Sequence, residues 1–167
     1  MLFRPNRHFT LGNFIPSRAN QYARATGAWF IHARRPRPNT LLVTGPTGSG
    51  KSHLLHALAN FAKQNEVIRS MACMDAQQFA DEMDYGCFYR DLDAVLDRFA
   101  TEDLLAIDNV DQVSQQREAA ALLVGLMEVR QARNKRTLLT ATTPEIQAAS
   151  IPLAALLHAL PTVRLAA

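Results

Sequence analysis

Two hydrophobic patterns alternate along the chain from about residue 40 onward. Short, nearly continuous apolar runs are typical of strands buried in a parallel sheet, whereas apolar residues spaced three or four positions apart are typical of amphipathic helices. Their alternation predicts an α/β fold in which helices cover both faces of a parallel sheet. The expected strands are residues 40–44, 67–72, 104–108 and 137–141, with residues 162–165 as a candidate fifth.

Helical spacing of apolar residues occurs in six segments, and a proline-led short helix is expected after the fourth strand. The expected helices are residues 17–33, 53–62, 75–83, 92–99, 115–133 and 153–159, with Thr143-Pro144-Glu145 opening the short one. The buried stripe of the first helix is expected to contain Tyr22, Ala25, Trp29 and Ile31. Asp75 and Gln78 have capping-box spacing, and residues 84–86 are expected to end that helix. The chain before Pro16 is expected to be extended.

The size and composition indicate one globular domain with a buried core. The chain has 167 residues, and 48% of them are apolar. No apolar run approaches the length of a membrane span, and the first residues lack the apolar core of a signal peptide, so we expect a cytoplasmic location without a membrane partner. Cys73 and Cys87 have no metal-binding or redox spacing, and we expect two reduced thiols.

Charge is distributed unevenly along the chain. Residues 1–65 contain nine Lys and Arg and no acid, whereas residues 66–118 contain thirteen acids and four Arg. This asymmetry indicates a basic face that could contact a phosphate backbone or an acidic partner, although packing of basic against acidic segments is an equal alternative. A smaller basic cluster lies at the end of a predicted helix, where the helix dipole alone favours it. It consists of Arg130, Arg133, Lys135 and Arg136.

The most specific motif is Gly-Pro-Thr-Gly-Ser-Gly-Lys-Ser at residues 45–52, which fits the phosphate-loop pattern G-x-x-x-x-G-K-[ST]. It lies between an expected strand and an expected helix, the context in which this pattern binds nucleotide phosphates. Its glycines allow backbone conformations in which successive N–H groups surround an anion. Lys51 is placed to reach the β- and γ-phosphates, and Ser52 to bind Mg²⁺. The other expected contacts in the loop are Thr47, Gly48, Ser49 and Gly50.

An apolar strand ending in an acid, residues 104–108, has the Walker B form. Asp108 would hold Mg²⁺ at the carboxyl end of its strand, and the alternative role is a helix or turn cap. Asn109 follows where many ATPases carry an acid that activates water. Because an amide can orient water but cannot take its proton, we expect binding with slow hydrolysis. Among the threonines that close the next strand, Thr142 is the third catalytic candidate, and capping the helix at Pro144 is an equal alternative.

Several stretches resemble one protein family. Residues 50–58, Gly-Lys-Ser-His-Leu-Leu-His-Ala-Leu, resemble the G-K-[ST]-H-L-L-H-A-[IL] signature of the family of the bacterial replication initiator DnaA and its regulatory relative Hda. Residues 9–15 and 20–23 resemble that family's aromatic-T-F-x-N-F-V and N-R-F-A stretches, and residues 107–110 are similar to the Walker B strand of Hda. The resemblance covers essentially the whole chain.

The resemblance implies an AAA+ core, that is, a three-layer P-loop NTPase with a five-stranded parallel sheet and ATP or ADP as its ligand. It implies one domain over residues 1–167, with the adenine side in 1–39 and the α/β core in 40–167. The nucleotide site would also include Asn13, Phe14, Ile15, Asn20 and His53. The implied role is initiation of chromosome replication or its control. The implied partner is a DnaA-type AAA+ protein or another replisome component, and the basic N-terminal region offers a route to DNA.

Three departures from the family pattern narrow this expectation. Residues 152–157, where the family carries its arginine finger, contain no arginine. The helical lid is expected to be absent, and neither an initiator-type helix-turn-helix nor a clamp-binding peptide is evident. We therefore expect a nucleotide-dependent interaction module with at most weak or partner-dependent ATPase activity. An autonomous ATPase such as a helicase-loader motor is the alternative, and a small-molecule P-loop kinase ranks last.

Overall fold

Five parallel strands form a single sheet in the order β2-β3-β4-β1-β5. The computed structural model describes residues 3–18, 20–33, 38–142 and 151–166. The strands are β1 (Thr40–Thr44), β2 (Met71–Asp75), β3 (Leu104–Asp108), β4 (Arg136–Ala141) and β5 (Thr162–Arg164). The predicted parallel sheet is confirmed, and the candidate fifth strand, predicted at residues 162–165, is β5. The second strand was predicted at residues 67–72 and instead runs from Met71 to Asp75.

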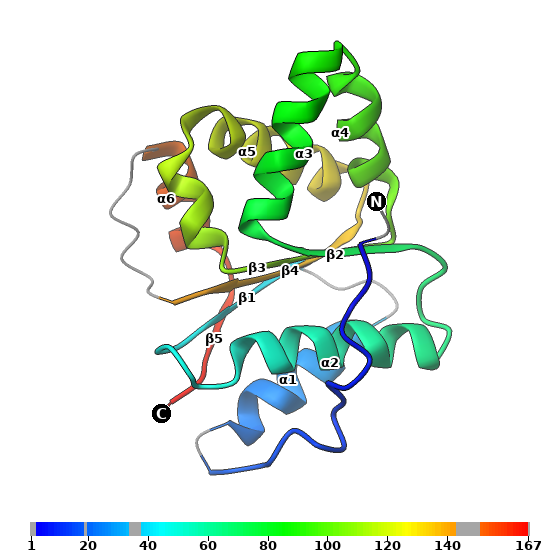
Figure 1. The fold of residues 1–167 in the computed structure, drawn as a ribbon. Helices are drawn as coiled ribbons and strands as arrows, with labels where there is room; N and C mark the ends of the chain where they lie inside the picture. Colours follow the sequence, from blue (N-terminus) through cyan, green and yellow to red (C-terminus); the bar gives the residue numbers. More distant parts are fainter. Residues whose placement is uncertain (1–2, 19, 34–37, 143–150, 167) are drawn as a thin grey trace.

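Helices cover both faces of the sheet, which gives the three layers expected (Figure 1). On one face lie α1 (Gln21–His32) and α2 (Lys51–Gln64). On the other lie α3 (Ala76–Tyr89), α4 (Leu92–Thr101), α5 (Arg117–Ala132) and α6 (Ile151–Ala159), with the short 3-10 helix η1 (Val110–Gln115) after β3. Within the described ranges, no helix is both long and apolar enough to cross a bilayer.

Side chains of the strands pack into two hydrophobic cores, one on each face of the sheet. Successive residues of β3 alternate between them: Leu104 and Ala106 pack on the side of α1 and α2, while Leu105 and Ile107 pack on the side of the other helices. A strand buried on both faces needs apolar residues at every position, and this requirement explains the continuous apolar runs in the sequence.

The buried face of α1 differs from the predicted one. Of the four residues predicted to be buried, Ile31 is buried, but Ala25 is exposed and Tyr22 and Trp29 are 71% and 61% exposed. The other buried residues of the helix are Ala23, Gly27 and Phe30. A Cβ atom at Gly27 would lie 2.5 Å from a methyl group of Leu58 in α2. The smallest residue of α1 therefore marks its contact face, because it lets the two helices approach closely.

The predicted end of α3 is also wrong. The capping box is present, since the Asp75 side chain accepts from the Gln78 backbone at 2.8 Å and Gln78 Oε1 accepts from the Asp75 backbone at 3.0 Å. The helix nevertheless continues through residues 84–86 to Tyr89. Gly86 is buried there, and a Cβ atom would lie 3.1 Å from Leu92 Cα, so this glycine allows α4 to pack closely instead of ending the helix. The short helix predicted at Thr143-Pro144-Glu145 falls outside the described residues.

Candidate functional site

The glycine-rich loop joins the carboxyl end of β1 to the first turn of α2. Gly48 and Gly50 have φ values of 82° and 92°, in the left-handed region that residues with a Cβ atom rarely adopt. Gly50 is the N-cap of α2, and the helix begins at Lys51. The loop therefore faces the positive end of the helix dipole, where anions are favoured.

The floor of the loop is tightly packed. A Cβ atom at Gly45 would lie 2.6 Å from the Leu165 carbonyl oxygen and 2.7 Å from Ser49 Oγ. Ser49 Oγ is itself buried and has no hydrogen-bond partner among the residues that the structure describes. A buried hydroxyl without a partner is unfavourable, so the floor of the loop contains a polar group whose burial is not compensated within the described residues.

The Lys51 side chain curls back over the loop. It is only 5% exposed, and its Nζ donates to the carbonyl oxygens of Gly45 at 2.9 Å and Pro46 at 2.8 Å. An ammonium group has three N–H donors. Two of them are directed at carbonyls of the loop itself, so within the described residues one donor and a buried positive charge could still meet an anion.

The end of β3 is tied to β4 by a threonine. The fully buried Thr140 hydroxyl donates to Asp108 Oδ1 and accepts from the Asn109 backbone N–H at 2.8 Å. Asn109 has φ 53° and ψ 47°, a left-handed conformation that asparagine tolerates better than most residues. Thr142 lies just beyond β4 and is partly buried. The Asp108 carboxylate and the threonine hydroxyl that orients it thus lie at the carboxyl edge of the sheet.

The donor set at this edge suits magnesium better than a transition metal. Among the residues described, no three His, Cys, Asp or Glu side chains converge on one point. Mg²⁺ in nucleotide sites uses one or two protein oxygens, phosphate oxygens and water. Ser52 in the first turn of α2 and Asp108 at the end of β3 could supply those protein oxygens.

The N-terminal segment folds over α2 in turns and is not extended as predicted (Figure 1). The Asn13 side chain accepts from Thr10 N at 2.8 Å and donates to the His8 carbonyl at 2.7 Å. The Asn20 side chain similarly accepts from Ser17 N at 2.7 Å and donates to the Ile15 carbonyl at 3.0 Å. Both asparagines therefore shape the backbone through short-range turns, a common use of this side chain.

Two hydrophobic residues between these turns are placed differently. Phe14 is buried, and its ring lies next to Gly50 and edge-on to the His53 ring at 5.2 Å. Ile15 is 83% exposed. The predicted adenine-side residues thus divide into a buried ring against the phosphate loop, an exposed aliphatic side chain, and two asparagines that hold the backbone between them.

The two histidines of α2 contact the N-terminal segment and hold it against the helix. His53 Nε2 lies 3.2 Å from the Thr10 carbonyl oxygen, and its ring stacks on Phe9 at 4.7 Å. His56 Nδ1 accepts from the Asn6 N–H at 3.3 Å. Burial is the main cause that lowers the pKa of His56, although the Asp108 charge opposes the shift and His53 adds to it. His56 is consequently a neutral packing residue at physiological pH.

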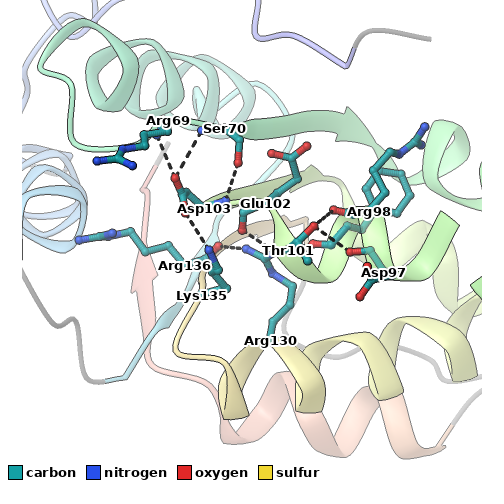
Figure 2. A network of polar contacts seen from close by, with 11 residues as sticks. Arg69, Ser70, Asp97, Arg98, Thr101, Glu102, Asp103, Arg130, Lys135 and Arg136 are labelled. Carbon is teal, nitrogen blue, oxygen red and sulfur yellow. Dashed lines mark hydrogen bonds and ion pairs between the residues drawn. The ribbon is translucent and has the colours of Figure 1, made fainter. Parts of the chain in front are cut away.

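The basic residues at the end of α5 form hydrogen bonds and ion pairs with other parts of the same chain (Figure 2). Arg130 is fully buried and donates to Thr137 Oγ1 at 3.0 Å and to the Glu102 carbonyl at 2.9 Å, and also to the carbonyls of Phe99 and Arg136. Burial lowers the pKa of Arg130 to about 10, so it stays charged at neutral pH. Arg133 and Lys135 form ion pairs with Asp97 and Asp103 at 3.1 and 2.8 Å. This cluster is therefore structural.

A phosphate loop after β1, an acid at the end of β3 and the strand order β2-β3-β4-β1-β5 together define the nucleotide-binding core of an AAA+ ATPase. The model of the bacterial DnaA ATPase domain matches residues 5–151, and the chain belongs to that family.

Individual relatives are replication initiators. The chain is 30% identical over 108 residues to the chromosomal replication initiator protein DnaA of Anaplasma marginale, which covers 64% of the chain and 23% of that protein. It is 21% identical over 142 residues to DnaA 2 of Chlamydia pneumoniae, covering 85% of the chain and 32% of that protein. The chain thus spans about a quarter to a third of the length of these relatives.

Solved structures share the fold. A replication initiator DnaA bound to AMPPCP and single-stranded DNA has a TM-score of 0.86 at 22% identity, over 96% of this chain and 50% of that one. The DnaC helicase loader has a TM-score of 0.71 at 17% identity, over 96% of this chain and 97% of that one. At these identities the likeness concerns the fold alone.

Proposed function

We propose that this chain is a nucleotide-binding module that takes ATP or ADP with Mg²⁺ at the loop of residues 45–52. The observation that carries the proposal is the buried Lys51 ammonium, which donates to the Gly45 and Pro46 carbonyls and has one donor left among the residues that the structure describes. Membership of the DnaA family supports the choice of an adenine nucleotide. Loop N–H groups and Lys51 would hold the phosphates, and Ser52 and Asp108 would hold Mg²⁺.

The adenine would lie against the N-terminal segment. The exposed Ile15 side chain offers an apolar contact for a flat base, and the buried Phe14 ring holds that segment against Gly50. Asn13 and Asn20 would act through the turns that they close, and His53 through its contact with Phe14. Thr142, at the end of β4, would face the γ-phosphate side of the site.

Hydrolysis by the isolated chain would be slow. Asn109 occupies the position after the Walker B acid, and an amide cannot act as a general base. We infer a cytoplasmic role in replication initiation or its control, in which the bound nucleotide changes contact with a DnaA-type protein or another replisome component. The helicase-loader fold likeness keeps an autonomous ATPase as the alternative, which measurable turnover abolished by Lys51→Ala would favour.

The test is a fluorescence titration with labelled ADP and ATP. Wild type should bind both, and Lys51→Ala should lose at least tenfold in affinity, since it removes the buried charge at the phosphates (about 1.4 kcal/mol per tenfold). Arg90→Asn is the matched control, because Arg90 is exposed at the far end of α3 and asparagine tolerates its φ of 57°. No binding by the wild type would refute the proposal.

A further inference from the structure

The end of α3, next to the turn into α4, presents a cluster of exposed aromatic rings. Tyr85, Phe88 and Tyr89 are 57%, 80% and 60% exposed, although such side chains usually bury most of their surface. The hairpin of α3 and α4 projects away from the sheet, so this aromatic tip lies at its far end (Figure 1). Neighbouring exposed apolar groups mark interaction surfaces, whereas single ones need no explanation.

The rings of the aromatic tip hold one another in place. The ring centroids of Tyr85 and Tyr89 lie 4.3 Å apart, and those of Phe88 and Tyr89 lie 5.0 Å apart, edge to face. The backbone beneath them is closed into a turn, because the carbonyl of the buried Gly86 accepts from the Asp91 N–H at 2.9 Å. An ordered surface loses less conformational entropy when a partner binds, so the tip is preorganised for contact.

Carboxylates surround the aromatic tip. Asp81 and Asp84 each lie four residues before one of its rings, and residues four apart are neighbours on the surface of a helix. Asp91 and Asp93 follow at the start of α4. All four acids are exposed and form no ion pair within the described parts of the chain, and Arg90 is the one cation in the sequence from 81 to 93. The surface is therefore aromatic and negatively charged at once.

From this arrangement we propose that the aromatic tip binds an arginine-rich segment of a partner protein. The face of an aromatic ring attracts a cation, and a guanidinium group can stack on a ring while it donates to a carboxylate beside that ring. The tip offers both groups side by side, and its charge is complementary to such a segment. The tip shares no residue with the loop of residues 45–52, so the inference goes beyond nucleotide binding and does not depend on it.

The charge of the tip disfavours the other occupants of an aromatic surface. A nucleic-acid strand that stacks its bases on aromatic rings needs a positively charged groove for its phosphates, whereas here the phosphates would meet carboxylates. An anionic membrane surface would be repelled in the same way. A symmetric contact between two copies of the chain would bring the same carboxylates face to face. A basic protein segment gains from both the rings and the carboxylates.

The experiment measures, by fluorescence anisotropy, binding of a labelled peptide of about twelve alternating arginine and glycine residues. The test variant is Phe88→Ala/Tyr89→Ala, which removes two exposed rings and leaves a good helix former in their place. We expect affinity about tenfold weaker, the size of two exposed cation–π contacts. The matched control, Tyr22→Ala/Trp29→Ala, removes two exposed rings from α1 on the opposite face of the sheet and should bind as wild type does.

A second pair of variants tests the carboxylates. Asp84→Asn/Asp93→Asn removes two charges with little change in size, and it should weaken peptide binding and reduce its dependence on salt. The control is Glu118→Gln/Glu128→Gln, which removes two exposed charges from α5 and should leave both properties unchanged. A Lys51→Ala variant should lose ADP binding and retain peptide binding. Failure of the nucleotide proposal would therefore leave this result unaffected.

Four results would overturn the proposal. Two of them are no peptide binding by the wild type and equal affinity of the two ring variants, Phe88→Ala/Tyr89→Ala and Tyr22→Ala/Trp29→Ala. The third is binding of oligothymidylate that the Phe88→Ala/Tyr89→Ala variant abolishes, which would assign the tip to nucleic acid. The fourth is a dimer of the wild type that the same variant dissociates, which would assign the tip to a second copy of the chain.

Discussion

The hydroxyl of Thr140 donates a hydrogen bond to the carboxylate of Asp108, and this contact joins the ends of two neighbouring strands. The same hydroxyl oxygen accepts from the backbone of the residue after Asp108 at 2.8 Å. A single buried side chain thus fixes both the orientation of the candidate magnesium ligand and the turn that follows it.

Thr140→Val should weaken this arrangement, because valine has nearly the same shape but neither donates nor accepts a hydrogen bond. The variant leaves a partly buried N–H group without its partner, and the free energy of unfolding should fall by about 1–3 kcal/mol in urea denaturation. Affinity for ADP should fall in the presence of Mg²⁺ and stay unchanged in EDTA. Thr140→Ser, which keeps the hydroxyl, should restore most of both; equal loss in EDTA would contradict a role through the metal.

Arg130→Lys should destabilise the fold strongly although it keeps the charge. Lysine cannot direct donors at once to Thr137 and to the surrounding carbonyls, so buried acceptors would be left unpaired. We expect about 3–5 kcal/mol of lost unfolding free energy. The control is Arg133→Ala, which removes an exposed ion pair to Asp97 and should change stability by about 0–1 kcal/mol. Similar losses in the two variants would refute the buried network as the cause.

The two thiols should differ in reactivity. Burial, with a contribution from the Asp108 charge, raises the pKa of Cys73 to about 12, whereas Cys87 is exposed on α3. Since the thiolate is the reactive form, iodoacetamide should modify Cys87 alone in the folded protein at neutral pH. Mass spectrometry of the labelled chain checks this, with denatured protein as the control in which both react. Rapid labelling of Cys73 without unfolding would show that the contact between the N-terminal segment and β2 opens.

Stability should decline as the pH falls through the ordinary range of histidine. Because the pKa of His56 is lowered in the folded state, the unfolded chain binds a proton first as pH falls below about 6.5, and folding is disfavoured from there downward. Urea denaturation at pH 7.5 and 5.5, both approximate choices around that value, should show a smaller difference for His56→Gln than for wild type. His158→Gln, at an exposed position, is the control and should keep the wild-type difference.

The strands were predicted well where a continuous apolar run coincides with burial on both faces, as for β1 and β3. β2 was predicted at residues 67–72 and lies at Met71–Asp75, because Ile68 is apolar for packing under α2 before the strand begins. The predicted stripe of α1 was right at Ile31 and wrong at Tyr22 and Trp29. Its large aromatic residues suggested burial, but a close approach of two helices selects the small Gly27.

The phosphate loop could be recognised because its groups lie within eight consecutive residues, 45–52. Thr140 could not be singled out from the other threonines of its strand, since its role depends on β3 and β4 pairing side by side.

The position of β1 in the sheet has a consequence for the order in which the strands pair during folding. Among the five strands of the described sheet, β1 comes first in sequence, yet its two neighbours are β4 and β5, which come last. The Leu165 N–H reaches back to the Thr44 carbonyl at 2.7 Å, directly beside the glycine-rich loop. Pairings across such long stretches of chain form slowly and late. On the ribosome, the glycine-rich loop would therefore lack its contact with Leu165 until that residue had emerged, and a nascent chain would complete the loop only after β5 had paired with β1.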